Sequence, residues 1–215
     1  MDPICYIVGA QEPGELVLSR ARPALVIAAD AGLRHLEAQG IPADLIVGDF
    51  DSLGRVPEGE NVVRHPVEKD DTDMMLAVKI GLDRGARDFV LYGGLGGRLD
   101  HAYANLQTLV WLTRHGARGW LLGRGTAVTA LRCGRMEFPE SLTGAISVFC
   151  PDGEARGVDL EGLYYPLRNA VLTSAFPLGV SNRFTGRPAA VSVGEGTLLV
   201  MWDEPPAGVI GRQFG

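Results

Sequence analysis

Residues 89–101, FVLYGGLGGRLDH, decide the fold of this chain. The apolar run Phe89–Tyr92 is typical of a strand that is buried on both faces of a sheet. Four glycines follow within five residues, and a helical pattern of apolar residues then extends over Asp100–His115. A strand that passes through a tight loop into a helix is the repeating unit of a parallel sheet covered by helices.

The same alternation recurs on both sides of this unit. We expect further strands at Ile4–Val8, Ala24–Ala29, Leu45–Val47 and Trp120–Leu122. Helical patterns cover Gly32–Gln39 and Thr72–Arg84. The first part of the chain, residues 1–124, is therefore predicted to be an α/β domain: a Rossmann-like parallel sheet with helices on both faces.

The pattern changes after Gly125. Short alternating runs are separated by Gly, Pro and Asp, and no amphipathic helix is evident. The strand candidates are Ala127–Arg132, Ile146–Phe149, Ala170–Thr173 and Thr197–Trp202. We expect residues 125–215 to form a second domain, an all-β sandwich.

Composition limits the classes of protein to consider. The chain has 215 residues, 46% hydrophobic and 21% charged, as in ordinary globular proteins. Its net charge of −6 and the lack of a basic run argue against a nucleic-acid partner. Three widely spaced cysteines, Cys5, Cys133 and Cys150, predict neither a disulfide framework nor a zinc site. No signal peptide and no apolar stretch near the ~20 residues of a membrane span are evident, so we expect a cytoplasmic protein without a membrane partner.

Acidic residues follow several of the predicted strands. Asp30 comes directly after one strand, Asp49 and Asp51 after the next, and Asp100 beyond Phe89–Tyr92. One such Asp is usually a helix cap or a turn former. In an open α/β sheet, however, ligands bind outside the carboxyl ends of the strands, and four carboxylates at that edge favour a functional site.

The segment Gly48–Ser52 places two carboxylates two residues apart. Residues i and i+2 of an extended chain face the same side, so Asp49 and Asp51 can approach one cation. Mg²⁺ takes one or two protein carboxylates together with phosphate oxygens. The alternative is a polar turn in which Asp51 or Ser52 caps a neighbouring element.

A second acidic run, Lys69–Asp73, precedes a predicted helix. Asp and Thr are preferred caps, and acidic residues suit the first turn of a helix. Capping explains one or two of the three carboxylates. The functional interpretation assigns Asp70 and Asp73 to a metal or a substrate, and Lys69 to a phosphate.

The glycine-rich loop suits a polyphosphate, although it matches neither a Walker loop nor a dinucleotide-binding fingerprint. Glycines let backbone N–H groups approach phosphate, and the helix start that follows favours anions. Arg98 is placed to neutralise charge on a transferred group. His101 and Asn105 share one face of the helix. For His101, a hydrogen-bonding role is favoured over that of a catalytic base.

These motifs together resemble those of the thiamine pyrophosphokinase family. In the N-terminal half the resemblance lies in Asp30–Gly32, Gly48–Ser52, Lys69–Asp73, and Gly93–His101 with Asn105. In the C-terminal half, Gly162–Leu167 and Gly179–Asn182 are similar to the thiamine-binding β-domain of that family. The resemblance implies transfer of a pyrophosphoryl group from Mg·ATP to thiamine, giving thiamine diphosphate and AMP.

The resemblance also implies roles for individual residues. The catalytic set comprises Asp30, Asp49, Asp51, Asp70, Asp73, Arg98 and Asp100, of which Asp49, Asp51, Asp70 and Asp73 hold Mg²⁺. The ATP-binding set comprises Ser52, Lys69, Thr72, Gly94, Gly96, Gly97, Arg98, His101 and Asn105. The thiamine-binding set comprises Asp30, Asp100, Ser181 and Asn182. Either Asp30 or Asp100 would accept the alcohol proton, and neither is singled out.

The resemblance further implies a homodimer in which the β-domain of one subunit completes the site of the other. One residue departs from the family pattern: Arg183 follows Ser181-Asn182 where many relatives carry an acidic residue. Two alternatives remain open at this point. One is a pyrophosphokinase for another hydroxymethyl heterocycle, such as a reduced pterin, and the other is a regulator that binds nucleotide or thiamine without turnover.

Overall fold

The computed structural model describes residues 3–18, 24–50, 57, 59–64, 71–123 and 125–203. Its described part has a mixed α/β fold with one large sheet and three helices. The first six strands are β1 (Ile4–Val8), β2 (Ala24–Ala29), β3 (Leu45–Gly48), β4 (Val62–Arg64), β5 (Asp88–Tyr92) and β6 (Arg118–Gly123). They pair in parallel in the order β6-β5-β1-β2-β3-β4.

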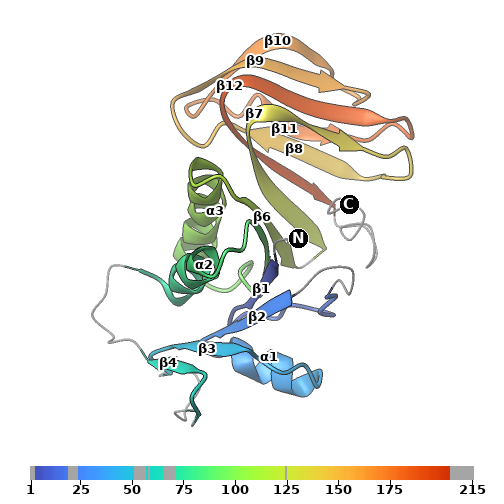
Figure 1. Cartoon of the computed structure of the whole chain (residues 1–215). Helices are drawn as coiled ribbons and strands as arrows, with labels where there is room; N and C mark the ends of the chain where they lie inside the picture. Colours follow the sequence, from blue (N-terminus) through green and yellow to red (C-terminus); the bar gives the residue numbers. More distant parts are fainter. Residues whose placement is uncertain are drawn as a thin grey trace.

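Helices cover both faces of this parallel region (Figure 1). They are α1 (Gly32–Ala38), α2 (Asp73–Asp83) and α3 (Leu99–Arg114). Successive residues of a strand point to opposite faces. Tyr6 of β1 therefore packs in the cluster that contains Leu33 of α1. Its neighbour Ile7 packs in the cluster that contains Ala77 of α2 and Leu109 of α3.

The order of the strands creates a switch point between β1 and β5. The chain runs from β1 outward through β2, β3 and β4, and then returns to place β5 on the other side of β1. The segments that leave the carboxyl ends of β1 and β5 therefore diverge to opposite faces. Ligands of open α/β sheets bind in the crevice at such a point.

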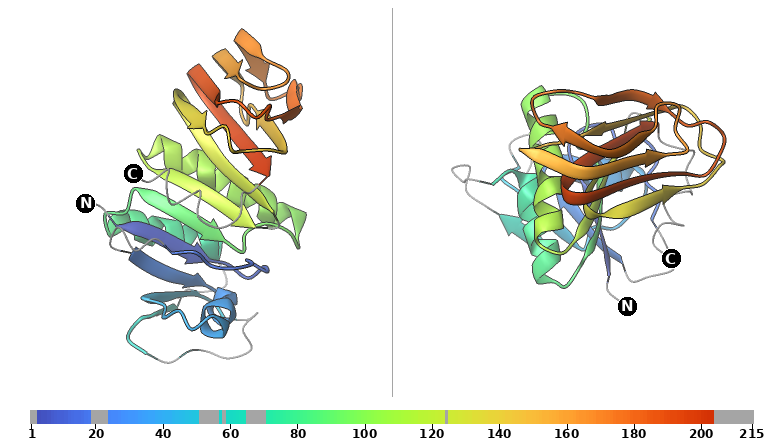
Figure 2. Two further views of the ribbon diagram at one scale, coloured as in Figure 1. Left: turned by 90° about the vertical axis from the view of Figure 1, so that its right-hand side faces the viewer. Right: turned by 90° about the horizontal axis from the view of Figure 1, so that it is seen from above.

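The C-terminal half consists of β7 (Thr126–Phe138), β8 (Ala145–Phe149), β9 (Glu154–Glu161), β10 (Leu167–Thr173), β11 (Gly179–Arg183) and β12 (Ala189–Asp203). All of its strand pairs are antiparallel. Figure 2 shows this half stacked beyond β6, at the end of the sheet away from β3 and β4. Strand β7 pairs with β6 and then with β12, so hydrogen bonding continues across the predicted boundary near residue 124. The division at that residue stays a prediction.

The pairing of β7 with β12 contains a bulge. Their register shifts between Val193 and Thr197 of β12, opposite Cys133 of β7, which has a φ of 43°. Bulges bend and twist the strand that carries them. On the edge of β12 that faces away from β7, the partner is β9 in the first part of the strand and β8 after the bulge.

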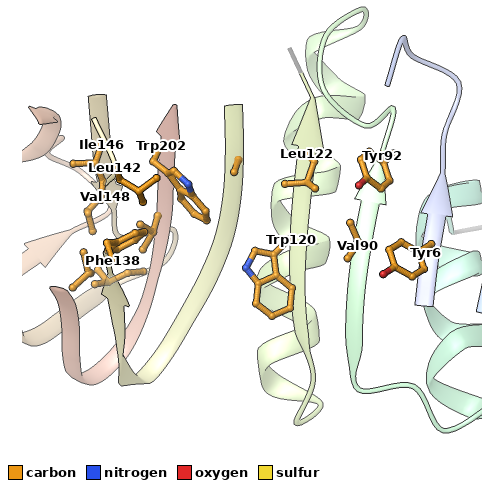
Figure 3. Packing of buried hydrophobic residues seen from close by; sticks show 14 of the residues in the cluster. Tyr6, Val90, Tyr92, Trp120, Leu122, Phe138, Leu142, Ile146, Val148 and Trp202 are labelled. Carbon is orange, nitrogen blue, oxygen red and sulfur yellow. The ribbon is translucent and has the colours of Figure 1, made fainter. Parts of the chain in front are cut away.

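A single apolar cluster extends along both halves, as Figure 3 shows. Tyr92 and Trp120 belong to its part on the parallel strands, and Phe138 and Trp202 to its part within the β-rich half. The rings of Phe138 and Trp202 meet edge to face, with centroids 5.5 Å apart. Aromatic pairs of this geometry add about 0.5–1.5 kcal/mol beyond the area that they bury.

The predicted elements of the N-terminal half agree with the structure to within a residue or two, and the α/β fold class is confirmed in this coarse form. Three strands, β4, β9 and β11, were not predicted, and β7 and β12 are longer than expected. Within the described residues no helix is long and apolar enough to cross a membrane.

The start of α1 depends on a close approach to β1. A Cβ atom at position 32 would lie 1.8 Å from the carbonyl oxygen of Val8. We expect Gly32→Ala to lower the free energy of unfolding by about 3 kcal/mol, because the helix must move away from the strand. Gly134→Ala is the matched control, since the nearest atom to its new methyl group is 3.4 Å away. Urea unfolding measures both, and equal stability of the two variants would contradict the close packing.

Candidate active site

A cavity of about 320 Å³ lies at the switch point between β1 and β5. Loops from the carboxyl ends of the strands and the first turns of α2 and α3 form its wall. Eight of the predicted site residues line it: Asp30, Thr72, Asp73, Gly94, Gly96, Arg98, His101 and Asn105. The wall also includes Gly9, Ala10, Gln11, Ala29, Asp71, Met74 and Gly93.

A larger groove of about 1220 Å³ lies elsewhere, along β6, β7 and the start of β12. None of the predicted site residues that the structure describes lines this groove. It borders the amino-terminal part of β6, at Arg118, rather than the carboxyl ends of the parallel strands. We therefore assign the candidate active site to the smaller cavity, where the chemistry-bearing side chains meet.

Asp30 directly follows β2 and has a strained backbone conformation. Its φ is 49°, its side chain is buried, and its backbone N–H donates to the carbonyl oxygen of Val47 at 2.8 Å. Residue Ala31 occupies the cap position of α1, and no side chain caps that helix. The usual role of an Asp after a strand is thus not the role of Asp30. A left-handed non-glycine residue in a crevice is typical of functional sites.

The metal-binding prediction is only partly within the described chain. Asp49 follows β3 and is half-buried, but it does not line the cavity. Asp51, Ser52, Lys69 and Asp70 lie outside the described residues. Among those that the structure describes, no three His, Cys, Asp or Glu residues form a group suited to a metal ion.

The start of α2 divides the acidic run into separate roles. The Thr72 hydroxyl caps the helix by accepting from the Met75 N–H at 3.1 Å. Both carboxylate oxygens of Asp71 accept from the Lys79 ammonium, at 2.6 and 2.8 Å. Asp73, in the first turn, lines the cavity. Asp71 is therefore paired with Lys79 of the same helix, and Asp73 is the acidic residue of the first turn that lines the cavity.

The glycine-rich loop is held closely against its surroundings. The buried Asn105 side chain donates to the Gly94 carbonyl oxygen at 2.9 Å, so it fixes the loop from the side of α3. A Cβ atom at Gly93 would lie 2.5 Å from the carbonyl oxygen of Gly9. Gly93 also has a φ of 64°, which favours glycine. The loop thus brings backbone close to the cavity at the positive end of a 16-residue helix.

Arg98 and Asp100 form an exposed ion pair at the first turn of α3. The guanidinium donates to both carboxylate oxygens, at 3.1 and 2.6 Å. The hydrogen bond from Arg98 lowers the pKa of Asp100 to about 2. A carboxylate with that pKa is a poor acceptor for an alcohol proton near neutral pH. Of the two candidate bases, Asp30 is therefore the better supported by the described geometry.

Sequence reasoning missed the segment 9–11, which follows β1 and lines the cavity. It contains no charged residue, and its side chains match no motif. Its position supplied the only signal, because a segment leaving the carboxyl end of the first strand is expected to reach the ligand crevice. The role of Asp71 as the partner of Lys79 was also missed.

Of the four predicted thiamine contacts, Asp30 lines the cavity, Asp100 does not, and Ser181 and Asn182 lie in β11. Among the described residues, none beyond Asn105 belongs to the cavity wall of the same chain. The buried Asn182 amide accepts from the Tyr165 N–H at 2.9 Å and donates to the Tyr165 carbonyl oxygen at 2.7 Å. It therefore holds the Tyr164-Tyr165 turn beside β11. Ser181 is exposed, with a φ of 60°. Direct contact of either residue with thiamine stays a prediction.

Arg183 has a specific partner. Its guanidinium carbon lies 4.0 Å from the ring centroid of Tyr164, and its carbonyl oxygen accepts from the Tyr164 N–H at 3.0 Å. A guanidinium over an aromatic face is attracted by the ring quadrupole. The cation that departs from the family pattern is therefore engaged with a neighbouring aromatic side chain.

The pairing of Arg98 with Asp100 is testable by titration. Because hydrogen bonds to a carboxylate favour its charged form, we expect Arg98→Met to raise the pKa of Asp100 from about 2 toward the ordinary value of about 3.9. NMR titration of the Asp100 carboxyl carbon measures the shift, with Arg114→Met as a control at the far end of α3. An unchanged pKa in Arg98→Met would contradict the ion pair.

Comparison with known proteins places this arrangement in one family. Residues 19–121 match the model described as the catalytic domain of thiamin pyrophosphokinase, and residues 135–198 match its vitamin B1 binding domain. A curated protein of Bacillus subtilis, named thiamine pyrophosphokinase, is 26% identical over 184 residues, which cover 82% of this chain and 86% of that protein.

Solved structures share the fold. The thiamine pyrophosphokinase of Bacillus subtilis superimposes with a TM-score of 0.80 at 22% identity, covering 94% of this chain and 99% of the other. The yeast enzyme does so with a TM-score of 0.68 at 13% identity, covering 94% and 86%. The matched catalytic domain lies in the half that contains the cavity, and the matched vitamin B1 binding domain lies in the β-rich half. The chain belongs to the thiamine pyrophosphokinase family.

Proposed function

We propose that the reaction of this thiamine diphosphokinase takes place in the cavity at the switch point. The observation that carries this proposal is the convergence of Asp30, Asp73 and Arg98 with a glycine-rich loop in one cavity. Carboxylates suit a cationic acceptor and a phosphate-bound metal, whereas Arg98 and the loop suit a polyphosphate. Both substrates of a pyrophosphoryl transfer thus find complementary groups there.

The transfer joins the hydroxyl oxygen of thiamine to the β-phosphorus of ATP. The bond from that phosphorus to the oxygen bridging the α- and β-phosphates breaks, AMP leaves, and the hydroxyl proton passes to a base. Such transfers depend mainly on positioning and electrostatic stabilisation. Arg98 and the backbone of the glycine-rich loop orient the polyphosphate. The buried carboxylate of Asp30 is the candidate acceptor for the proton.

Magnesium is the proposed cofactor. The described donors are carboxylate oxygens and the helix-capping Thr72, all hard oxygen ligands of the kind that Mg²⁺ prefers. Asp73 would hold the ion together with phosphate oxygens, joined by Asp49, Asp51 and Asp70 as the sequence predicts. The ion, when bound, would offset the negative charge of the polyphosphate.

We further propose that the enzyme is a homodimer with shared sites. Among the described residues, the cavity wall includes none from the β-rich half of the same chain, which is the half that matches a vitamin B1 binding domain. That half also exposes apolar side chains near β11: Tyr164, Tyr165, Phe176, Leu178 and Val180. Apolar side chains gathered on one surface are typical of protein interfaces. If a second copy of the chain covers these side chains, β11 of one copy would lie at the cavity of the other copy. The cytoplasm remains the expected location.

Release of AMP from Mg·ATP, with and without thiamine, tests the reaction. We expect AMP and thiamine diphosphate to form in equal amounts, and only when thiamine is present. Mass spectrometry measures both products. Asp73→Asn should lower kcat/KM by about a hundredfold, because it removes a charge at the polyphosphate with little change in volume. Asp83→Asn, at the exposed far end of α2, is the control. AMP without thiamine diphosphate would indicate another acceptor, and bound ATP without AMP would indicate a regulator.

Mixed dimers test the shared site. Asp73→Asn impairs the cavity, and Ser181→Trp fills the space in front of β11. Neither variant should be active alone. If each site combines one cavity with the partner's β11, random mixing should restore about a quarter of the wild-type activity, because half of the dimers contain one intact site. Co-expression with two affinity tags provides the mixed dimer. No recovery, or a monomer in sedimentation, would contradict the shared site.

A further inference from the structure

The segment that follows β1 is fixed at three points. The Gly9 N–H donates to the Tyr92 carbonyl oxygen at 2.8 Å. The Gln11 N–H donates to the Gly93 carbonyl oxygen at 3.0 Å. Between them, the carbonyl oxygen of Ala10 bonds to the imidazole of His35 on α1 at 3.1 Å. This backbone is therefore preorganised, and the side chain at position 11 leaves from a defined point at the switch between β1 and β5.

The side chain of Gln11 lies against the glycine-rich loop. A Cβ atom at Gly97 would lie 2.4 Å from the Gln11 Oε1 atom and 2.7 Å from its Nε2 atom. The amide thus occupies the space that any larger residue at position 97 would need. Gln11 is half-buried and lines the cavity. No described residue exchanges a hydrogen bond with this amide, so both of its polar atoms remain available to a ligand.

We propose that Gln11 is a nucleotide-contacting residue, whose side-chain N–H donates to a phosphate oxygen of the donor and holds the polyphosphate between segment 9–11 and the glycine-rich loop. This inference rests on the proposed function of the cavity. It identifies a residue of the segment after β1 whose side chain lies against the glycine-rich loop that leads into α3, and none of the family motifs includes it.

The chemistry of an amide suits this place. The polyphosphate is anionic, and a carboxylate at position 11 would repel it, whereas an amide donates without adding charge. The acceptor is a cation, for which the cavity already offers Asp30 and Asp73. The neutral amide lies beside the glycine-rich backbone, where N–H groups favour an anion. The polyphosphate is therefore the substrate part that it contacts.

The change Gln11→Glu tests this inference, because it keeps the shape of the side chain and introduces a negative charge. We expect it to raise the KM for Mg·ATP by tenfold or more, with the KM for thiamine changed by less than about twofold. Gln11→Ala should raise the KM for Mg·ATP by about fivefold through the lost hydrogen bond. Gln107→Glu, on the exposed face of α3, makes the same charge change outside the cavity and should leave both constants unaltered.

Calorimetric titration with Mg·ATP alone, together with the melting temperature of each variant, separates the outcomes. Weaker Mg·ATP binding by Gln11→Glu in a protein of unchanged melting temperature supports the contact. Unchanged Mg·ATP binding by both Gln11 variants overturns it, and so does a rise in the KM for thiamine alone. Should the wild type bind Mg·ATP without releasing AMP, the proposed reaction fails, but the titration of these variants still decides the role of Gln11.

Discussion

The contact between the segments leaving β1 and β5 is the constraint on which the site depends. At Gly93 the glycine-rich loop comes so close to segment 9–11 that a methyl group there would lie 2.5 Å from the Gly9 carbonyl oxygen. The Gln11 N–H bonds to the Gly93 carbonyl oxygen across the same contact. Two loops that diverge from adjacent strands are thereby fixed side by side, and the cavity between them is preorganised before any ligand binds.

Helix starts supply the remaining walls, and residues of the cavity wall themselves fix these helix starts. Thr72 caps α2, and Lys79 neutralises Asp71, which leaves Asp73 in the cavity wall. Asn105 fixes the glycine-rich loop from α3. Asp30 does not cap α1 and is buried in a left-handed conformation. Structural contacts thus fix the residues of the wall in place before a ligand binds, which is the condition for preorganised electrostatic stabilisation.

Five of the six parallel strands in the described chain were predictable because their apolar runs are nearly continuous and are followed by glycine or aspartate. The sixth, β4, was missed because it has only two apolar residues, Val62 and Val63. Strand β9 was missed because charged residues alternate with Ala155, Val158 and Leu160, and Gly157 interrupts the pattern with a φ of 63°. Of the carboxylates predicted at strand ends, Asp30 lines the cavity, whereas Asp49 and Asp100 do not, and the glycine-rich loop and the start of α2 identified more of its wall. Segment 9–11 was not identified, because its contribution comes from backbone position and a neutral amide, and these appear only when β1 and β5 are placed side by side.

The continuity of β7 and β12 explains how two matched domains act as one structure. Strand β7 pairs with β12 on both sides of the bulge, and it also pairs with β6 of the parallel region. The β-rich half is therefore joined to the parallel strands by the hydrogen bonds of a continuous sheet. Within that half, Asn182 holds the Tyr164-Tyr165 turn, and Arg183 lies over the Tyr164 ring. The guanidinium of Arg183 therefore has a partner within its own half of the chain, the face of the Tyr164 ring.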